Sequence, residues 1–159
     1  MSEGKRPGGL TALAVINFIL GGFVLLGVLG FIGGGIAMKY MPESEVAKMP
    51  AEKQVEIEKA EKIFADPTIR VLNGFNVPVA ALLIISGIGY LMQKKVMGNI
   101  LGNTYALLDI ILSIMGIVLM DSELVEGAGN FNLMTMIGFI YPVLTLFLIN
   151  TTFKDDLVN

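Results

Sequence analysis

The sequence contains no cysteine, no histidine and no tryptophan. Without cysteine there is neither a disulfide framework nor thiolate chemistry. Without histidine the chain has neither the usual general base near neutral pH nor the commonest metal ligand. A membrane hydrolase or transferase would show a cluster of histidines and acids at one interface, and no such cluster is visible. We therefore predict a non-enzymatic protein with no catalytic residues, no metal and no cofactor.

Charge is also scarce. Charged residues make up 16% of the chain, and the net charge is -3, whereas soluble domains are about 25% charged. Nothing basic is concentrated enough to neutralise phosphates, so we expect no nucleic-acid partner. What is abundant is apolar surface, with 54% hydrophobic residues and a mean hydropathy of +0.73. This composition predicts an integral membrane protein, and the 159 residues allow a single transmembrane domain over 1–159.

Four apolar segments stand out, and a spanning helix needs about 20 apolar residues to cross roughly 30 Å of hydrocarbon. They predict an all-α, four-helix transmembrane bundle. The first segment is longer than needed, so it tilts, projects from the bilayer or breaks at Gly33–Gly35. The predicted spans are 10–37, 67–92, 96–120 and 132–149.

The hydrophilic loop over residues 39–66 predicts a short amphipathic helix after Pro50. Glu58 and Lys62 are an i,i+4 pair in the favourable order. Two interpretations are open: the helix lies on the membrane or on the outer face of the protein, or it docks a partner. Asp66 is a good N-cap for the following helix, in which Pro67 occupies a tolerated first-turn position.

The short loops set the predicted orientation. The N-terminal tail carries Lys5 and Arg6, and the loop between the second and third segments carries Lys94 and Lys95. The loop between the third and fourth segments has acids and no basic residue. Positive residues favour the cytoplasmic side, so we expect both termini in the cytoplasm. The basic residues of the long first loop oppose this count, but glutamates are interspersed among them.

An internal repeat links the second and fourth segments, which contain "GFNVPVAALLI" and "GFIYPVLTLFL". Pro78 and Pro142 each remove a helical N–H and crowd the carbonyl four residues earlier, so we expect two matching kinks. The first and third segments match more weakly, with Asn17 aligned with Asp109. The pattern favours a 2+2 hairpin pseudo-repeat in the parallel sense, and the alternative is chance similarity between apolar strings.

Asp109 is a carboxylate in the middle of the third segment, within "ALLDIILSIMG". A carboxylate there costs on the order of 3 kcal/mol, so it should face protein or water. Asn17 could pair with it, and Ser113 lies one turn away on the same face. Asp109 is either a structural hydrogen-bonding link or a proton- or cation-binding group. A titrating site would also need polar residues leading to each surface, and the candidates are Tyr105, Tyr141 and Thr145. Small and polar residues form a stripe along one face of the third segment, and such stripes are helix-packing faces in membranes. We therefore expect this face to pack against the first segment. The stripe comprises Gly102, Ala106, Asp109, Ser113 and Gly116.

Two GxxxG motifs predict close helix packing. They are Gly30 with Gly34, and Gly98 with Gly102. Such motifs let helix backbones approach closely, within the bundle or between molecules. Self-association and docking onto another membrane protein are the alternatives to packing within the chain.

The start "KRPGGLTALAVINFILGG" resembles that of many small, uncharacterised bacterial and archaeal membrane proteins, and the tail "YPVLTLFLINTTFKDDL" is similar to theirs. The resemblance implies a small multi-helix protein of the prokaryotic inner membrane and carries no activity. The positions that carry it at the start are Arg6, Pro7, Gly9, Thr11, Asn17, Gly21 and Gly22.

The favoured function is an accessory or structural subunit. It would sit in the lipid bilayer and pack against a larger membrane protein complex or as a homo-oligomer. The alternative is a small proton- or ion-coupled carrier in which Asp109 titrates.

Overall fold

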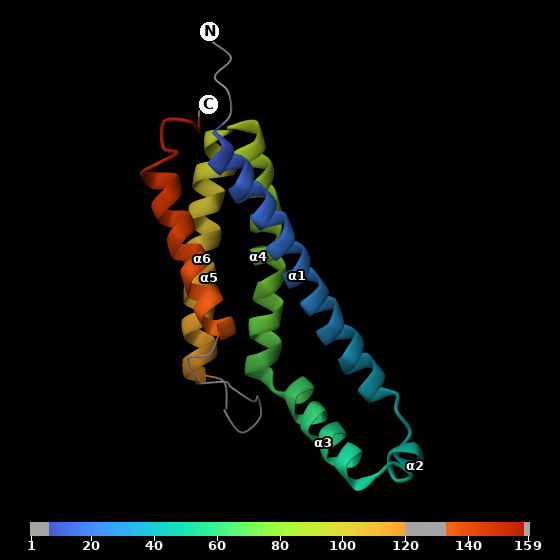
Figure 1. Cartoon of the computed structure of the whole chain (residues 1–159). Coiled ribbons are helices and arrows are strands. Elements are labelled where there is room, and N and C mark those ends of the chain that lie inside the picture. Colours follow the sequence, from blue (N-terminus) through green and yellow to red (C-terminus); the bar gives the residue numbers. More distant parts are fainter. Residues whose placement is uncertain (1–6, 120–132, 158–159) are drawn as a thin grey trace.

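The structure, a computed structural model, describes residues 7–119 and 133–157. Every regular element in these two ranges is a helix, and neither range contains a β-strand (Figure 1). The predicted all-α class is therefore confirmed. The elements are α1 (Gly8–Lys39), α2 (Glu43–Val46), α3 (Ala51–Ala65), α4 (Pro67–Met92), the π-helix η1 (Lys95–Ile100), α5 (Leu101–Leu119) and α6 (Leu133–Asn150).

Three helical segments are long and apolar enough to cross a membrane: α1, α4 and the continuous segment Lys95–Leu119 formed by η1 and α5. Their bounds lie within about two residues of the predicted spans. They indicate a membrane protein whose apolar surface contacts lipid. α6 has 18 residues and is shorter than these three segments.

Helix α1 runs without interruption through its three consecutive glycines. Its 32 residues correspond to about 48 Å at 1.5 Å per residue, which exceeds the roughly 30 Å of the hydrocarbon core. The break that was one alternative at Gly33–Gly35 does not occur. An intact backbone leaves tilt or projection to absorb the extra length.

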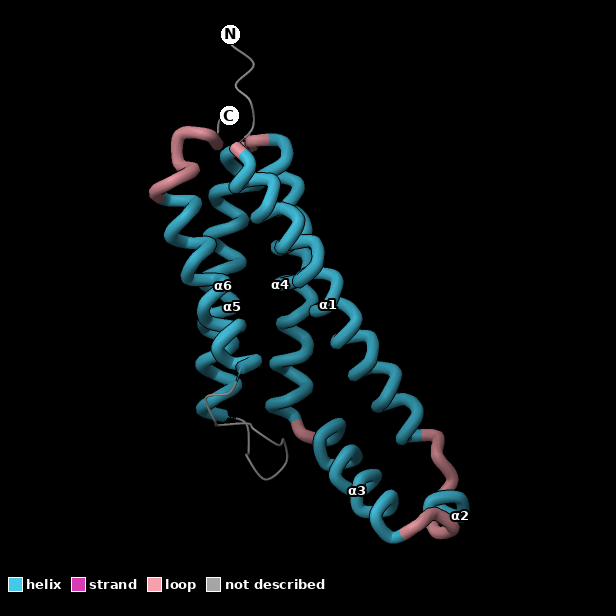
Figure 2. Tube along the Cα trace, in the orientation of Figure 1, coloured by secondary structure: helices cyan, strands magenta, loops and turns pink. Residues whose placement is uncertain are grey.

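The helices pack as neighbours in a simple order. α1 packs along α4, α5 packs along α6, and α4 contacts α5 and η1 (Figure 1). The described connections lie at the two ends of the molecule (Figure 2). Phe153, after α6, contacts Gly9 at the start of α1, so the two ends of the described chain meet.

The predicted helix of the first loop is present as α3, and the Glu58–Lys62 pair forms with 2.8 Å between carboxylate oxygen and Nζ. Asp66 caps α4 as predicted, because its Oδ1 accepts a hydrogen bond of 2.9 Å from the Ile69 N–H. α3 packs on α1 through Phe64, whose ring centroid lies 5.1 Å from that of Phe31. The four-residue helix α2 is not predicted from the sequence.

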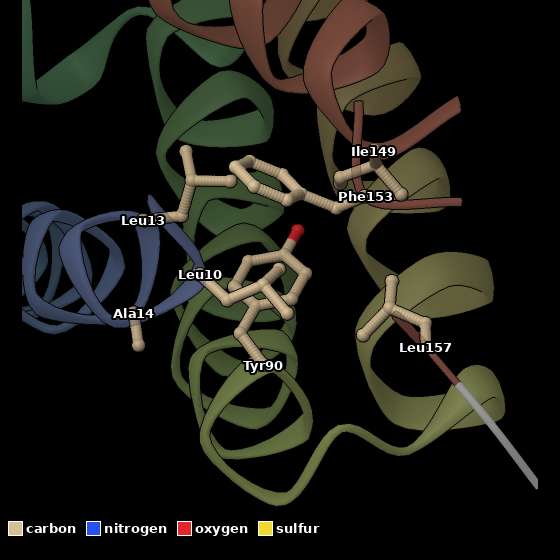
Figure 3. Close-up of a cluster of buried hydrophobic side chains, with 7 residues drawn as sticks. All are labelled: Leu10, Leu13, Ala14, Tyr90, Ile149, Phe153 and Leu157. Carbon is tan, nitrogen blue, oxygen red and sulfur yellow. The ribbon is translucent and has the colours of Figure 1, made fainter. Parts of the chain in front are cut away.

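Two apolar clusters form the core. The first gathers the start of α1, the end of α4 and the C-terminal segment around the Tyr90 ring (Figure 3). The second lies where α4 meets α5 and includes Val79, Leu83, Tyr105 and Ala106. Tyr141 of α6 packs against both clusters, so the region between them joins all four long helices.

Both predicted prolines lie inside helices. Pro78 is exposed within α4, whereas Pro142 is fully buried within α6. Neither helix ends at its proline, and the kinks stay a prediction.

Candidate functional site

Asn17 is the centre of a buried hydrogen-bond network. Its side chain is fully buried, and Nδ2 donates to Ser86 Oγ at 2.8 Å. The Tyr141 hydroxyl donates to Asn17 Oδ1. The Ser86 hydroxyl in turn donates to the Leu83 carbonyl at 3.0 Å. One amide therefore links α1 to α4 and to α6.

Three more hydroxyl groups surround this network. They belong to Tyr90, Tyr105 and Thr145, and each oxygen is buried without a hydrogen-bond partner in the described ranges. The Tyr90 hydroxyl lies close to Asn17 and Ser86 but without hydrogen-bond geometry to either. An unpaired buried hydroxyl is costly in an apolar environment. The cluster therefore concentrates unused hydrogen-bonding capacity where four helices meet.

Asp109 lies beside this cluster and not within the network. It is half-buried in α5, one turn beyond Tyr105. No hydrogen bond or ion pair joins its carboxylate to residues 7–119 or 133–157. The predicted pairing of Asn17 with Asp109 is therefore wrong. Tyr105 stands at the level of Tyr141, with ring centroids 6.3 Å apart, and this places Asp109 one turn too far along α5.

Ser113 lies one further turn along α5, against α6. A Cβ at Gly138 would lie 3.1 Å from the Ser113 Oγ, so the two helices are close at this point. The predicted small-and-polar stripe does face other helices, because Gly102 is buried and Ser113 is half-buried. Its neighbours are α4 and α6, whereas the prediction was α1.

The predicted packing glycines have different surroundings. Gly98 and Gly102 both lie against Tyr90, and Gly102 leaves no room for a side chain there. A Cβ at Gly34 would lie 2.6 Å from Phe64 of α3. Gly30 faces open space, since a Cβ there would meet nothing within 4 Å, so it takes no part in packing with the described part of the chain.

Sequence reasoning missed the glycines that join α1 to α4 and α4 to η1. A Cβ at Gly21 would lie 2.9 Å from Ile84, and one at Gly87 would lie 3.0 Å from Phe18. Gly89 lies directly against the backbone of Gly98. None of these three belongs to a GxxxG motif that we singled out, and close contact alone reveals them.

Ser86 and Tyr90 are the functional candidates that sequence reasoning missed. They are one turn apart on a buried face of α4. A signal was available, because polar side chains inside an apolar segment should face protein and not lipid. Asn103 and Asn150 were missed as well, although they exchange amide hydrogen bonds of 3.2 and 2.7 Å between α5 and α6.

The residues that carry the sequence resemblance meet in space. Gly9 contacts Phe153, and Asn17 is hydrogen-bonded to Tyr141, so the characteristic start of the chain packs against its characteristic tail.

Chemically, the buried polar cluster around Asn17 offers hydroxyl and amide groups with one acid, Asp109, beside it. No three acidic side chains of the described residues are grouped so that they could hold a metal ion. The chain matches no protein-family model, no curated protein and no solved structure.

Proposed function

We propose that the protein is a non-enzymatic accessory or structural subunit that packs against a larger membrane complex or a second copy of itself. One observation carries this proposal: α1 has an open glycine face. A Cβ at Gly27, Gly30 or Gly33 would meet no atom of residues 7–119 or 133–157 within 4 Å. Residues three apart lie on the same side of a helix. In membranes, small residues mark faces where another helix approaches closely.

Bulky apolar side chains surround this face. Leu26 and Leu29 are 64% and 63% exposed, and Phe23 is 66% exposed. A shallow glycine surface between large side chains suits a ridge of side chains from another helix.

The polar cluster supports a structural role in a second way. The Asn17 network ties three helices together beneath the apolar cluster around Tyr90. Such hydrogen bonds stabilise membrane helix packing by about 0.6 to 2 kcal/mol each. A fixed bundle interior leaves the outer faces available for partners.

The architecture we propose is a four-helix bundle of two related hairpins in one transmembrane domain over 1–159, with both termini in the cytoplasm of a prokaryotic cell. In its support, α1 packs along α4 and α5 packs along α6. The second helix of each pair carries one internal proline, Pro78 or Pro142. The described ends of the chain also lie together, near Gly9 and Phe153.

Native gel electrophoresis with mass spectrometry on gently solubilised membranes tests the subunit proposal. We expect the protein in an assembly of fixed stoichiometry. Gly30→Leu fills the open face and should release the protein as a smaller species. Gly74→Leu is the matched control, because a Cβ there also meets nothing within 4 Å but lies on α4. A wild-type protein that migrates alone would reject the proposal.

A small proton- or ion-coupled carrier is the second candidate. The observation in its favour is the Asp109 carboxylate, half-buried one turn beyond Tyr105, whose hydroxyl has no hydrogen-bond partner among the described residues. Asp109→Asn keeps the size of the side chain and removes its ability to titrate. A carrier in liposomes should lose proton or cation flux with this change, whereas Asp155→Asn on the exposed C-terminal segment should not alter it. Absence of flux in the wild type would reject this candidate.

A further inference from the structure

Helices α1 and α4 separate toward α3 (Figure 1). A groove lined by residues of these three helices lies there. It has a volume of about 570 Å³, which falls within the roughly 300–1,000 Å³ typical of ligand pockets. Its wall is mostly apolar and includes Val28, Ile32 and Val77. The groove therefore has the size and the surface to accept one amphiphilic molecule.

Two glycines give the groove its depth. Gly35 and Gly74 line it from α1 and α4, respectively. A Cβ at Gly74 would meet nothing within 4 Å, so this position is empty of protein. Farther along the same two helices, Gly21 and Gly87 bring α1 and α4 into close contact. The groove is thus the part of the α1–α4 interface where the helices no longer close against each other.

Three charged side chains line the groove, one from each of its three helices. Lys39 ends α1, Arg70 lies in the first turn of α4, and Glu61 belongs to α3. The Arg70 Nε–H donates to the Phe64 carbonyl at 2.6 Å, which fixes the guanidinium and leaves its terminal nitrogens available. Neither Lys39 nor Arg70 forms an ion pair with any carboxylate that the structure describes. Among the residues that line the groove, two cations face one acid, so the lining carries one net positive charge.

The position of these charges indicates the source of the ligand. Lys39 stands at the point where the apolar sequence of α1 ends, and Arg70 stands near the start of α4. Long basic side chains at the ends of spanning helices reach for the membrane interface. Lipid head groups occupy that level, and their acyl chains run along the helices below it. Arg and Lys bind phosphate oxygens through charge-assisted hydrogen bonds.

We propose that this groove binds one phospholipid molecule from the bilayer. Its phosphate contacts Lys39 and Arg70, and an acyl chain lies along Val28, Ile32 and Val77 over Gly35. The single negative charge of the phosphodiester balances the net positive charge of the lining. This site is independent of the α1 glycine face, because Gly30 lies about 200° around the helix from Val28.

Native mass spectrometry of the purified full chain tests the proposal with two lipids that have the same acyl chains. Phosphatidylglycerol has the phosphate, and monogalactosyl diacylglycerol has a neutral head group of similar size. We expect one phosphatidylglycerol bound per chain, about a hundredfold more tightly than the galactolipid, because the phosphate makes two charge-assisted contacts, one with Lys39 and one with Arg70. Equal affinity for the two lipids would overturn the proposal.

Two pairs of variants locate the site. Lys39→Gln should weaken phosphatidylglycerol binding about tenfold, whereas Lys53→Gln on the exposed side of α3 should not. Both lysines are exposed, so folding is not at risk. Gly74→Leu fills the groove and should abolish binding of both lipids, whereas Gly30→Leu should retain it. Unchanged lipid binding in both Lys39→Gln and Gly74→Leu would reject the proposed phospholipid site. The site would also be rejected if a protein copurified with the chain and Gly74→Leu alone displaced it.

Discussion

A phenylalanine ring packs on a glycine at each end of α1, but the two rings are buried to different extents. At the start, Phe153 packs on Gly9 and is 8% exposed. At the far end, Phe64 packs on Gly34 and stays only half-buried. The first phenylalanine is enclosed by α1, α4, α6 and the C-terminal segment, whereas the second has α3 and α1 around it. The start of α1 is therefore enclosed in a packed cluster, whereas its far end borders the open groove.

Removing the two phenylalanines should expose this difference most strongly. We expect Phe153→Ala to lower the free energy of unfolding by about 3 kcal/mol, because it deletes a buried ring. Phe64→Ala should cost about 1 kcal/mol, because that ring is partly exposed before the change. Unfolding in detergent followed by circular dichroism measures both. Equal losses would contradict the proposed contrast between the ends.

The helix contacts at the end of the molecule where α1 begins are too tight to accommodate an added methyl group. Gly89 lies against the backbone of Gly98, so Gly89→Ala forces α4 and η1 apart. We expect a loss of about 2 kcal/mol in the same unfolding measurement. Gly27→Ala, on the open side of α1, should cause no loss, because its Cβ meets nothing within 4 Å. A stable Gly89→Ala protein would show that these helices can separate freely.

The Asn17 network should contribute less than the apolar contacts around it. Asn17→Leu removes the hydrogen bonds of Asn17 to Ser86 and Tyr141, whose hydroxyls keep backbone carbonyls as acceptors. We expect a loss of about 1 kcal/mol, in the range measured for hydrogen bonds between membrane helices. Asn73→Leu is the comparison toward the other end of α1, since among the described residues the Asn73 amide donates only to the Ile69 carbonyl of its own helix. The network would be unimportant if both variants unfolded alike.

The smallest effect concerns the exposed pair on α3. The hydrogen bond to Lys62 lowers the pKa of Glu58, and the same bond raises the pKa of Lys62. The pair therefore supports α3 at neutral pH, and its support is lost as the pH falls through the lowered pKa of Glu58. Hydrogen exchange over residues 51–65 should rise slightly in Glu58→Gln at pH 7. At a pH below that pKa, the variant and the wild type should exchange at the same rate over residues 51–65. The residues at the start of α1 should exchange at the same rate in both proteins at either pH.

Local patterns predicted most of the helices. Apolar runs fixed the bounds of α1, α4 and the η1–α5 segment, and the Asp66 cap and the Glu58–Lys62 pair each involve residues three or four apart. Such features depend on the chain within one or two turns, so one sequence carries them completely. The π-helical start of α5 was not predicted, because it arises where η1 packs tightly on Gly89.

The sequence by itself determined a helical membrane protein, poor in reactive side chains, with polar residues that must face inward. Only the tertiary structure decided which of these residues meet: Asn17 with Ser86 and Tyr141, and not with Asp109. It also decided that Gly34 is packed while Gly30 is open, and that a groove with unpaired cations forms beside α3. The physical reason is that partners across helices depend on the rotation and axial offset of whole helices. Those two quantities follow from the sum of many side-chain contacts, and no short stretch of sequence encodes them.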